Sequence, residues 1–381
     1  MSKTIRAPIN PDILEWALKD LNLSPEDFAQ KINVKPDTVK NWLNGDLEPT
    51  YKQLEKIAYK ILKLPLVAFF LAEQPENLTI KRKFRTLPEY LLDLTSYKTR
   101  IAIKMADFYR SALYELFGTN PSSNSIFREV KLTPEQNPSE AAQQLRNEFN
   151  FDIDVQKKFR NGYEAFNYYR ETLETKGIYL FQLQLEGDRG FCLLDNEFPV
   201  IVVNSGDSIN SKIFTLFHEL IHILIESDDI YKEVEPSPYL ESNTEIFCNQ
   251  TASEILVPLG ELAERYSGSL RYWDEDLVLQ IAKEYSVSKE VIFLKIVSLN
   301  YSSEADYKRL KAKWDKEFLE NRKKRKGGSY YVNKISALGR MYINTVIDSY
   351  KRGNINDVQV SNYLGIKFTN LLKMEAEVFA Q

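Results

Sequence analysis

Both histidines of this 381-residue chain lie within one stretch of five residues, His218-Glu219-Leu220-Ile221-His222. In a helix, residues four apart lie one turn apart on the same face, so these two imidazoles can reach a common point. Such a pair can bind one zinc ion, and the glutamate beside the first histidine can act as a general base on water held by the metal. The stretch therefore predicts a helix, zinc (Zn2+) as cofactor, His218 and His222 as metal ligands and Glu219 as the catalytic base.

A catalytic zinc site uses three protein ligands and leaves the fourth position for water. Because the chain has no third histidine, the remaining ligand must be a carboxylate or a cysteine. We expect Glu245, near the start of a helix over about residues 243–256, to be this ligand. Asn249 lies one turn further along the same face and can accept the distal N–H of a ligand histidine. The alternatives are a glutamate in the preceding loop, a glutamate on the opposite side of the helix and a cysteine that we expect to be core: Glu241, Glu254 and Cys248.

The composition is that of an ordinary globular protein, with 43% hydrophobic and 27% charged residues, and the length favours two or three domains. No apolar run reaches the roughly 18–20 residues of a membrane-spanning helix, and the first residues lack the apolar core of a secretion signal. Two cysteines are too few for a disulfide framework, so we expect reduced thiols and a cytoplasmic protein. The net charge of −4 means that any contact with nucleic acid needs a local patch.

The pattern of apolar residues predicts a mostly helical protein with one small sheet, an α+β fold. Two helices are expected first, at residues 139–149 and 163–176. Short apolar runs separated by turn residues then indicate three strands of an antiparallel or mixed sheet: residues 177–181, 190–194 and 198–203. A helix over about residues 210–226 follows the strands and carries the histidine pair.

Residues 10 to about 72 predict a bundle of five short helices, because residues that favour helix starts recur at regular intervals. Asn10-Pro11 and Ser24-Pro25 are typical of the first turn of a helix, and Asn44-Gly45 is typical of a helix end. The second and third helices are joined by a short turn, which is the helix-turn-helix arrangement.

The string FAQKINVKPDTVKNWLNGDLEPTYKQLEKIA within this bundle resembles the XRE (lambda-repressor-like) family. The resemblance implies that the start of the third helix faces the major groove of DNA, with these residues as candidate contacts: Lys35, Asp37, Thr38, Lys40 and Asn41. Residues 1–75 contain ten lysines and arginines against ten acidic residues, so the bundle is neutral. DNA binding and a protein-docking or purely structural role both stay open.

Changes in composition along the chain suggest four parts. We expect a helix-turn-helix domain at residues 1–75, a helical linker region at 76–135, a metallopeptidase domain at 136–320 and a helical extension at 321–381. The linker region includes the basic run Lys81–Arg85, which we expect to be a solvated surface.

The string FPVIVVNSGDSINSKIFTLFHELIHILI, followed by TEIFCNQTASEILVP, resembles the ImmA/IrrE family of bacterial metallopeptidases. That resemblance implies that His218, His222 and Glu245 correspond to zinc ligands and Glu219 to the catalytic base. The chain departs from the usual family pattern at Phe247-Cys248 and Thr251, which changes packing more than chemistry. Family members with an XRE module in front have the same order of parts as this chain.

We therefore expect a zinc-dependent endopeptidase fused to a DNA-binding module, which cuts a regulatory partner protein, such as a repressor, in bacterial transcriptional, stress or mobile-element control. The alternative is a non-catalytic transcription regulator, or the antitoxin of a toxin pair, in which the peptidase fold binds a partner as a scaffold. In either case we expect no membrane association, and the oligomeric state stays open, a dimer included.

Overall fold

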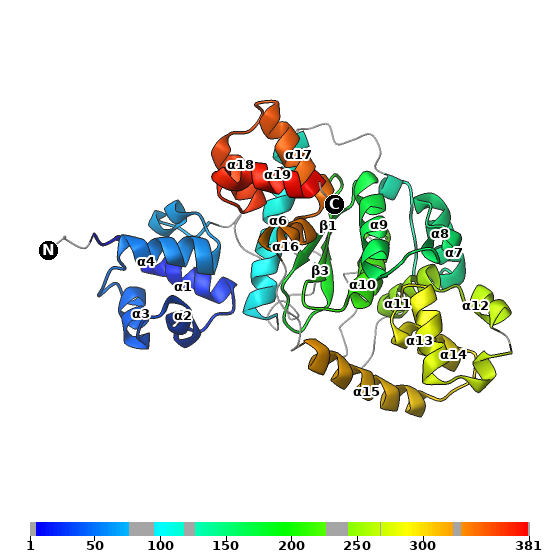
Figure 1. Cartoon of the computed structure of the whole chain (residues 1–381). Helices are drawn as coiled ribbons and strands as arrows, with labels where there is room; N and C mark the ends of the chain where they lie inside the picture. Colours follow the sequence, from blue (N-terminus) through cyan, green and yellow to red (C-terminus); the bar gives the residue numbers. More distant parts are fainter. Residues whose placement is uncertain are drawn as a thin grey trace. The chain divides into compact units, whose positions relative to one another are not determined.

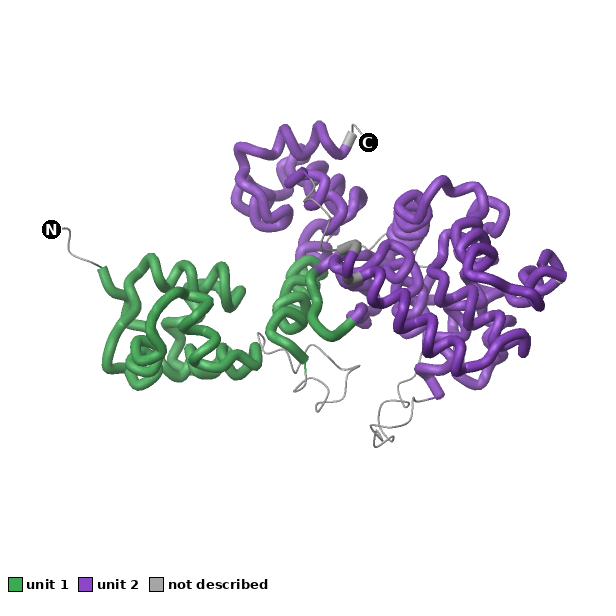
Figure 2. The backbone as a smooth tube through the Cα atoms, turned by 60° about the horizontal axis from the view of Figure 1, so that its bottom comes forward, with its two compact units in different colours: residues 1–111, 184–188 green, residues 112–183, 189–381 purple. Residues whose placement is uncertain are grey.

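The computed structural model describes residues 5–75, 95–117, 126–225, 243–266, 268–322 and 329–379. Two compact units form, one of residues 1–111 with 184–188 and one of residues 112–183 with 189–381 (Figure 2). The elements are mostly helices, with one three-stranded sheet in the second unit, so the predicted fold class is confirmed (Figure 1). The domain boundaries expected after residues 75, 135 and 320 stay predictions, because one compact unit can contain more than one domain.

Short helices form the start of the first unit: α1 (Pro11–Asp20), α2 (Pro25–Ile32), α3 (Pro36–Leu43) and α4 (Tyr51–Glu55), followed by a π-helical segment (Lys56–Leu62) and a 3-10 helix (Leu66–Phe70). The side chains of Asn10, Ser24 and Thr50 each accept a hydrogen bond from a backbone N–H in the first turn of α1, α2 and α4. Such caps satisfy backbone donors that the helix itself leaves unpaired. The starts of these helices are therefore fixed by local sequence.

Each of α1 to α4 contributes buried apolar side chains to the core of this unit, among them Leu14, Phe28, Trp42 and Leu54. The first part of a long helix, α6 (Tyr97–Phe117), completes it. Lys104 of α6 forms a buried ion pair with Asp20 at the end of α1, with 2.8 Å between Nζ and Oδ2. Arg100 donates a hydrogen bond of 2.7 Å to the backbone oxygen of Asp20. Part of the expected linker region thus packs with the helix-turn-helix bundle.

The sheet of the second unit is mixed. Its strands are β1 (Tyr179–Leu183), β2 (Gly190–Leu193) and β3 (Val200–Asn204), in the order β1-β3-β2. β3 lies in the centre, parallel to β1 and antiparallel to β2. The three strands fall where the apolar runs predicted them, within about two residues at each end.

Helices cover both faces of this sheet (Figure 1). On one face lie α9 (Gly162–Thr175) and α10 (Ile209–Leu224). α11 (Asn243–Leu256) packs against α10, and α7 (Pro138–Phe149) packs against α11. The main apolar core is on this side, and Leu180, Ile201 and Val203 contribute to it from the strands. The remaining described α-helices of this unit are α8 (Ile153–Gln156), α12 (Leu259–Arg265), α13 (Glu275–Glu284), α14 (Lys289–Ser298), α15 (Glu304–Arg322), α16 (Tyr330–Leu338), α17 (Arg340–Lys351), α18 (Asp357–Leu364) and α19 (Leu371–Phe379).

The carboxy-terminal helices pack against β1, mainly through α16. Phe181 of β1 meets Tyr342 of α17 edge to face, with 5.3 Å between the ring centroids. Arg170 of α9 is buried, forms an ion pair with Glu174 and donates a hydrogen bond of 2.7 Å to the backbone oxygen of Ser336 on α16. These contacts provide the packing partner of the last fifty residues, which the sequence did not indicate. No described helix meets the length and apolarity needed to cross a membrane.

Candidate metal centre and catalytic base

Helix α10 presents the two histidines at the border of the core. It begins at the cap Ser208, whose hydroxyl accepts a hydrogen bond of 3.1 Å from the backbone N–H of Ser211. Its apolar stripe is fully buried: Ile213, Leu216, Phe217, Leu220, Ile221 and Leu224. His218 and His222 lie beside that stripe and keep about 15% of their side chains exposed. The core therefore fixes the rotation of α10, and the helical period places both imidazoles on one side.

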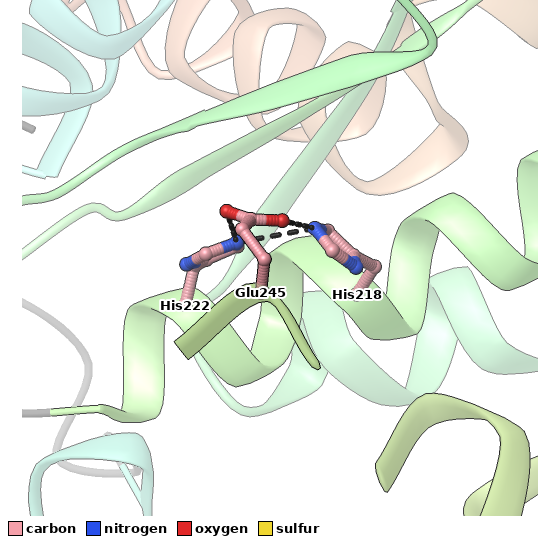
Figure 3. Close-up of side chains that lie close together, drawn as sticks. All are labelled: His218, His222 and Glu245. Carbon is pink, nitrogen blue, oxygen red and sulfur yellow. Dashed lines mark hydrogen bonds and ion pairs between the residues drawn. The ribbon is translucent and has the colours of Figure 1, made fainter. Parts of the chain in front are cut away.

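Helix α11 brings Glu245 to the same place. The Nε2 atoms of His218 and His222 are 3.1 Å apart. One carboxylate oxygen of Glu245 lies 3.3 Å from His218 Nε2, and the other lies 3.2 Å from His222 Nε2. The three side chains point toward one another (Figure 3). The three residues that the sequence predicted as ligands thus converge on one point.

The separations between these atoms fit a zinc ion. Ligand atoms about 2.0–2.1 Å from a tetrahedral zinc lie roughly 3.3–3.4 Å from each other. The observed separations of 3.1, 3.2 and 3.3 Å are close to that spacing. Two imidazoles and one carboxylate also form a donor set that zinc favours, with one position left open. The donor set fits zinc, and the assignment of the three residues as ligands stays a prediction.

The Glu245 carboxylate and the His218 imidazole each stabilise the charged form of the other. Hydrogen bonds to His218 and His222 hold the pKa of the Glu245 carboxyl well below its usual range. Burial alone would lower the pKa of His218, but its hydrogen bond to Glu245 and the nearby Glu219 carboxylate outweigh burial, so that pKa is raised. Glu245 is therefore an anion near neutral pH, as a metal ligand must be.

Glu219, the predicted base, is 8% exposed and follows His218 on α10. Burial raises the pKa of its carboxyl, although His222 and His218 attract the anion and oppose the rise. A buried carboxylate with a raised pKa is a stronger base than an exposed one. Its place beside the converging ligands is compatible with the role that the sequence predicted, which stays a prediction.

Two residues of β2 lie near Glu219 and were absent from the sequence-based predictions. The buried Cys192 thiol partly offsets the rise in the pKa of the Glu219 carboxyl. A Cβ added to Gly190 would lie 3.4 Å from Glu219 Oε1. A glycine inside a strand often marks a close approach of another chain segment, and this was the one signal available in the sequence.

The other candidates for the third ligand have surroundings that differ from those of Glu245. Glu254 forms an ion pair with Lys295 of α14 and accepts a hydrogen bond from the backbone N–H of Leu259. Cys248 is fully buried in the core, as expected. Glu241 lies outside the described residues, as does the basic run at residues 81–85.

Asn249, the predicted partner of a ligand histidine, is half-buried one turn after Glu245. A hydrogen bond to its side chain contributes to the raised pKa of His218. The buried Nδ1 of His218 nevertheless has no partner with full hydrogen-bond geometry among the described residues. The role of Asn249 stays a prediction.

The candidate DNA contacts lie on and just before α3 in the first unit. Four of them are exposed and one is half-buried, and their side chains are available to a partner: Lys35, Asp37, Lys40 and Asn41, with Thr38 half-buried. Val39 and Trp42 occupy the opposite, buried side of the helix. Exposure of these side chains does not show that they contact DNA, so their role in DNA binding stays a prediction.

Comparison with protein families supports both expected parts of the chain, the helix-turn-helix domain and the peptidase domain. Residues 173–296 match a peptidase family described as the IrrE N-terminal-like domain, and residues 14–59 match the helix-turn-helix family. The first segment contains α10 and α11 with the converging side chains, and the second contains α2 and α3. Comparison with curated proteins and with solved structures gave no match. The two matches follow one another along the chain and support the fusion of a helix-turn-helix domain with an IrrE N-terminal-like peptidase domain, in that order, as the two resemblances predicted.

Proposed function

We propose that this protein is a zinc-dependent endopeptidase that cuts a regulatory partner protein and is directed by a DNA-binding module. The observation that carries the proposal is the convergence of two imidazole nitrogens and one carboxylate, 3.1–3.3 Å apart, beside the buried Glu219. We also infer a cytoplasmic location, because DNA is found there and both cysteines are unpaired.

His218, His222 and Glu245 would hold the ion. When bound, zinc supplies Lewis acidity, which polarises a peptide carbonyl and makes water easier to deprotonate. A carboxylate oxygen of Glu219 takes a proton from the attacking water and then gives it to the nitrogen of the leaving amine. The burial of Glu219 limits access of bulk water, which would otherwise compete for that proton.

The rival function is a non-catalytic transcription regulator, or an antitoxin, that binds a toxin or a repressor on the peptidase fold. The observation that favours it is the exposed first turn of α3, which could bind DNA without any cleavage. The two functions differ in whether Glu219 is needed.

The decisive experiment replaces Glu219 by Gln, which keeps the size of the side chain and removes the base. We expect the purified variant to retain about one zinc per chain by elemental mass spectrometry. We expect profiling of new protein N-termini in bacterial cells to show a cleavage product with the wild-type chain and none with Glu219→Gln. Glu264→Gln, an exposed acid on α12, is the matched control and should cleave normally. A cellular phenotype that survives Glu219→Gln would favour the scaffold.

The DNA-binding part is tested separately. In a gel-shift assay with the upstream region of its own gene, Lys35→Ala, Thr38→Ala and Asn41→Ala should weaken binding. A plot of the logarithm of the binding constant against the logarithm of the salt concentration should also be less steep for Lys35→Ala, by about one unit of slope, because one phosphate contact is lost. Lys52→Ala on α4 removes an equal charge from an exposed position outside α3 and is the matched control. Equal binding by all variants would favour a protein-docking role for the bundle.

A further inference from the structure

The carboxy-terminal helices contain a turn that repeats the turn of the helix-turn-helix domain. α2 ends at Asn33, whose backbone is left-handed with φ +64°, and α18 ends at Gly365 with φ +60°. In both turns the next residue donates a backbone hydrogen bond to the residue five positions earlier: Val34 to Ala29 at 3.0 Å, and Ile366 to Ser361 at 3.1 Å. A left-handed residue with this hydrogen bond is a common helix end, so the turn alone does not indicate a function.

The helices on either side of the two turns also correspond. α2 and α18 each have eight residues and begin at a polar cap, Ser24 or Asn356, at the same distance before the left-handed residue. After the second turn, a 3-10 turn (Phe368–Asn370) leads into α19. From residue 35 to 44 and from residue 367 to 376, exposed, half-buried and buried side chains follow in the same order. α19 with its 3-10 turn therefore occupies the place that α3 has in the first domain.

A third turn of this kind shows what a structural example looks like. α13 is followed by Ser286, which is left-handed with φ +53°, and Val287 donates the same backbone hydrogen bond to Ala282 at 2.9 Å. The helix after this turn, α14, lies in the core. Its buried residues are Val291, Ile292, Phe293, Lys295 and Ile296. Phe293 also meets Trp314 of α15 edge to face, so α14 is covered on its outer side.

The helix after the carboxy-terminal turn presents its outer side to solvent and suits a polyanion. Its exposed side chains are Lys367, Phe368, Thr369, Leu372, Lys373 and Ala376, of which two are cationic and none is acidic. The nearby Glu375 is half-buried and forms an ion pair with Lys351 at the end of α17. The corresponding face of α3 includes the acidic Asp37, so the carboxy-terminal face carries more positive charge. Positive charge on such a helix favours contact with the phosphates of DNA.

We propose that α18 and α19, with the 3-10 turn between them, form a second DNA-binding helix-turn-helix. Lys367 and Lys373 contact phosphates, Thr369 can hydrogen-bond to base edges, and the 78% exposed Leu372 can contact the methyl group of thymine. The inference adds a DNA-binding element to the proposed function and rests on that function only in taking α3 as a helix that contacts DNA. Two linked elements that engage DNA together bind it more tightly than either element alone.

The first test measures binding of the full-length protein to a fluorescent DNA duplex of mixed sequence and about 30 base pairs, by anisotropy in roughly 50 to 200 mM salt. Lys367→Ala combined with Lys373→Ala should lower the affinity roughly 100-fold at the lowest salt and reduce the slope against salt by about two units. Lys308→Ala combined with Lys316→Ala removes the same charge from exposed positions of α15 and is the matched control. Equal affinities of the two double variants, or no binding by the wild-type chain, would overturn the proposal.

The second test separates this element from α3. The lysine pair of the carboxy-terminal helix is replaced in a chain that already carries Lys35→Ala and Asn41→Ala. The binding that remains in this background should depend on Lys367 and Lys373. If the α3 substitutions change nothing while the carboxy-terminal ones weaken binding, the DNA-binding part of the proposed function fails and the second element stands.

The third test locates the contact directly. The wild-type chain is cross-linked by ultraviolet light to the same duplex with 5-bromouracil in place of thymine, and the attached peptides are identified by mass spectrometry. We expect a cross-link in the tryptic peptide of residues 368–373, which contains Thr369 and Leu372. Cross-links that occur only elsewhere in the chain would show that this face does not contact DNA, and the exposed Leu372 would then indicate docking of a protein instead.

Discussion

Replacing Gly190 by Ala should displace Glu219, the proposed base, while leaving the proposed metal ligands in place. The added Cβ would lie 2.4 Å from the Thr215 methyl and 2.7 Å from the backbone oxygen of Val202. Restoring ordinary contacts of about 3.4 Å requires movements of about 1.0 Å and 0.7 Å respectively. The Val202 oxygen is held in the β-ladder, so most of the movement must separate β2 from α10.

The expected magnitudes follow from this displacement. Overpacking of a tight contact typically costs about 1–3 kcal/mol, and we expect the free energy of unfolding to fall by that amount. A displacement of about 1 Å between a catalytic group and its target can reduce the rate about 100-fold. His218, His222 and Glu245 come from α10 and α11 and not from β2, so zinc content should stay at the wild-type level.

Three measurements on the full-length protein check this reasoning: denaturant unfolding, zinc content and the rate of cleavage of the protein found by N-terminal profiling. Gly260→Ala at the start of α12 is the control, because nothing lies within 4 Å of the added Cβ and the backbone is not left-handed. It should be neutral or slightly stabilising. If Gly190→Ala is as stable and as active as Gly260→Ala, the close approach does not position Glu219. A loss of zinc in Gly190→Ala would place the damage in the metal site instead.

Four further predictions concern stability. Gly339→Ala should lower the free energy of unfolding by about 3–5 kcal/mol in denaturant titrations, because the backbone φ is +84° and the Cβ would lie 2.4 Å from the buried Arg170 guanidinium. Gly353→Ala, at φ +76° with nothing within 4 Å, should lose only about 1–2 kcal/mol. Lys104→Ala removes the ammonium group from the buried ion pair with Asp20, and hydrogen exchange of α1 should report a loss of about 3–5 kcal/mol. Zinc added to chelator-treated protein at 100 times its dissociation constant should stabilise the fold by about 2.7 kcal/mol, and magnesium should not.

The parts of the fold that the sequence predicted well are those fixed by local physics. Caps such as Ser24 and Thr50 define helix starts because the donors they satisfy lie within three residues. The helical period alone puts His218 and His222 on one side of α10. Glu245 could be predicted as the third metal ligand because a carboxylate near the start of the next helix was the simplest remaining candidate.

The contacts that the sequence did not predict join residues far apart in the chain. Gly190 lies close to Glu219 because β2 pairs antiparallel with β3, and the apolar runs allowed either an antiparallel or a mixed sheet. Arg170 meets the α16–α17 turn at Gly339 across more than 160 residues. A single glycine or arginine in such a place gives no periodic signal, so only the tertiary structure reveals its partner.

The burial of Glu219 favours chemistry over a scaffold role. A carboxylate that is 8% exposed, with a pKa raised by burial, makes the fold less stable than a neutral side chain of the same shape would. A domain that only docks a partner gains nothing in return, whereas a base needs this environment. Glu219→Gln should therefore raise the free energy of unfolding of the metal-free protein by about 0.5–2 kcal/mol, measured in denaturant, while it abolishes cleavage. If the Gln variant is less stable than the wild type, the carboxylate has a structural role, and its burial no longer argues for catalysis.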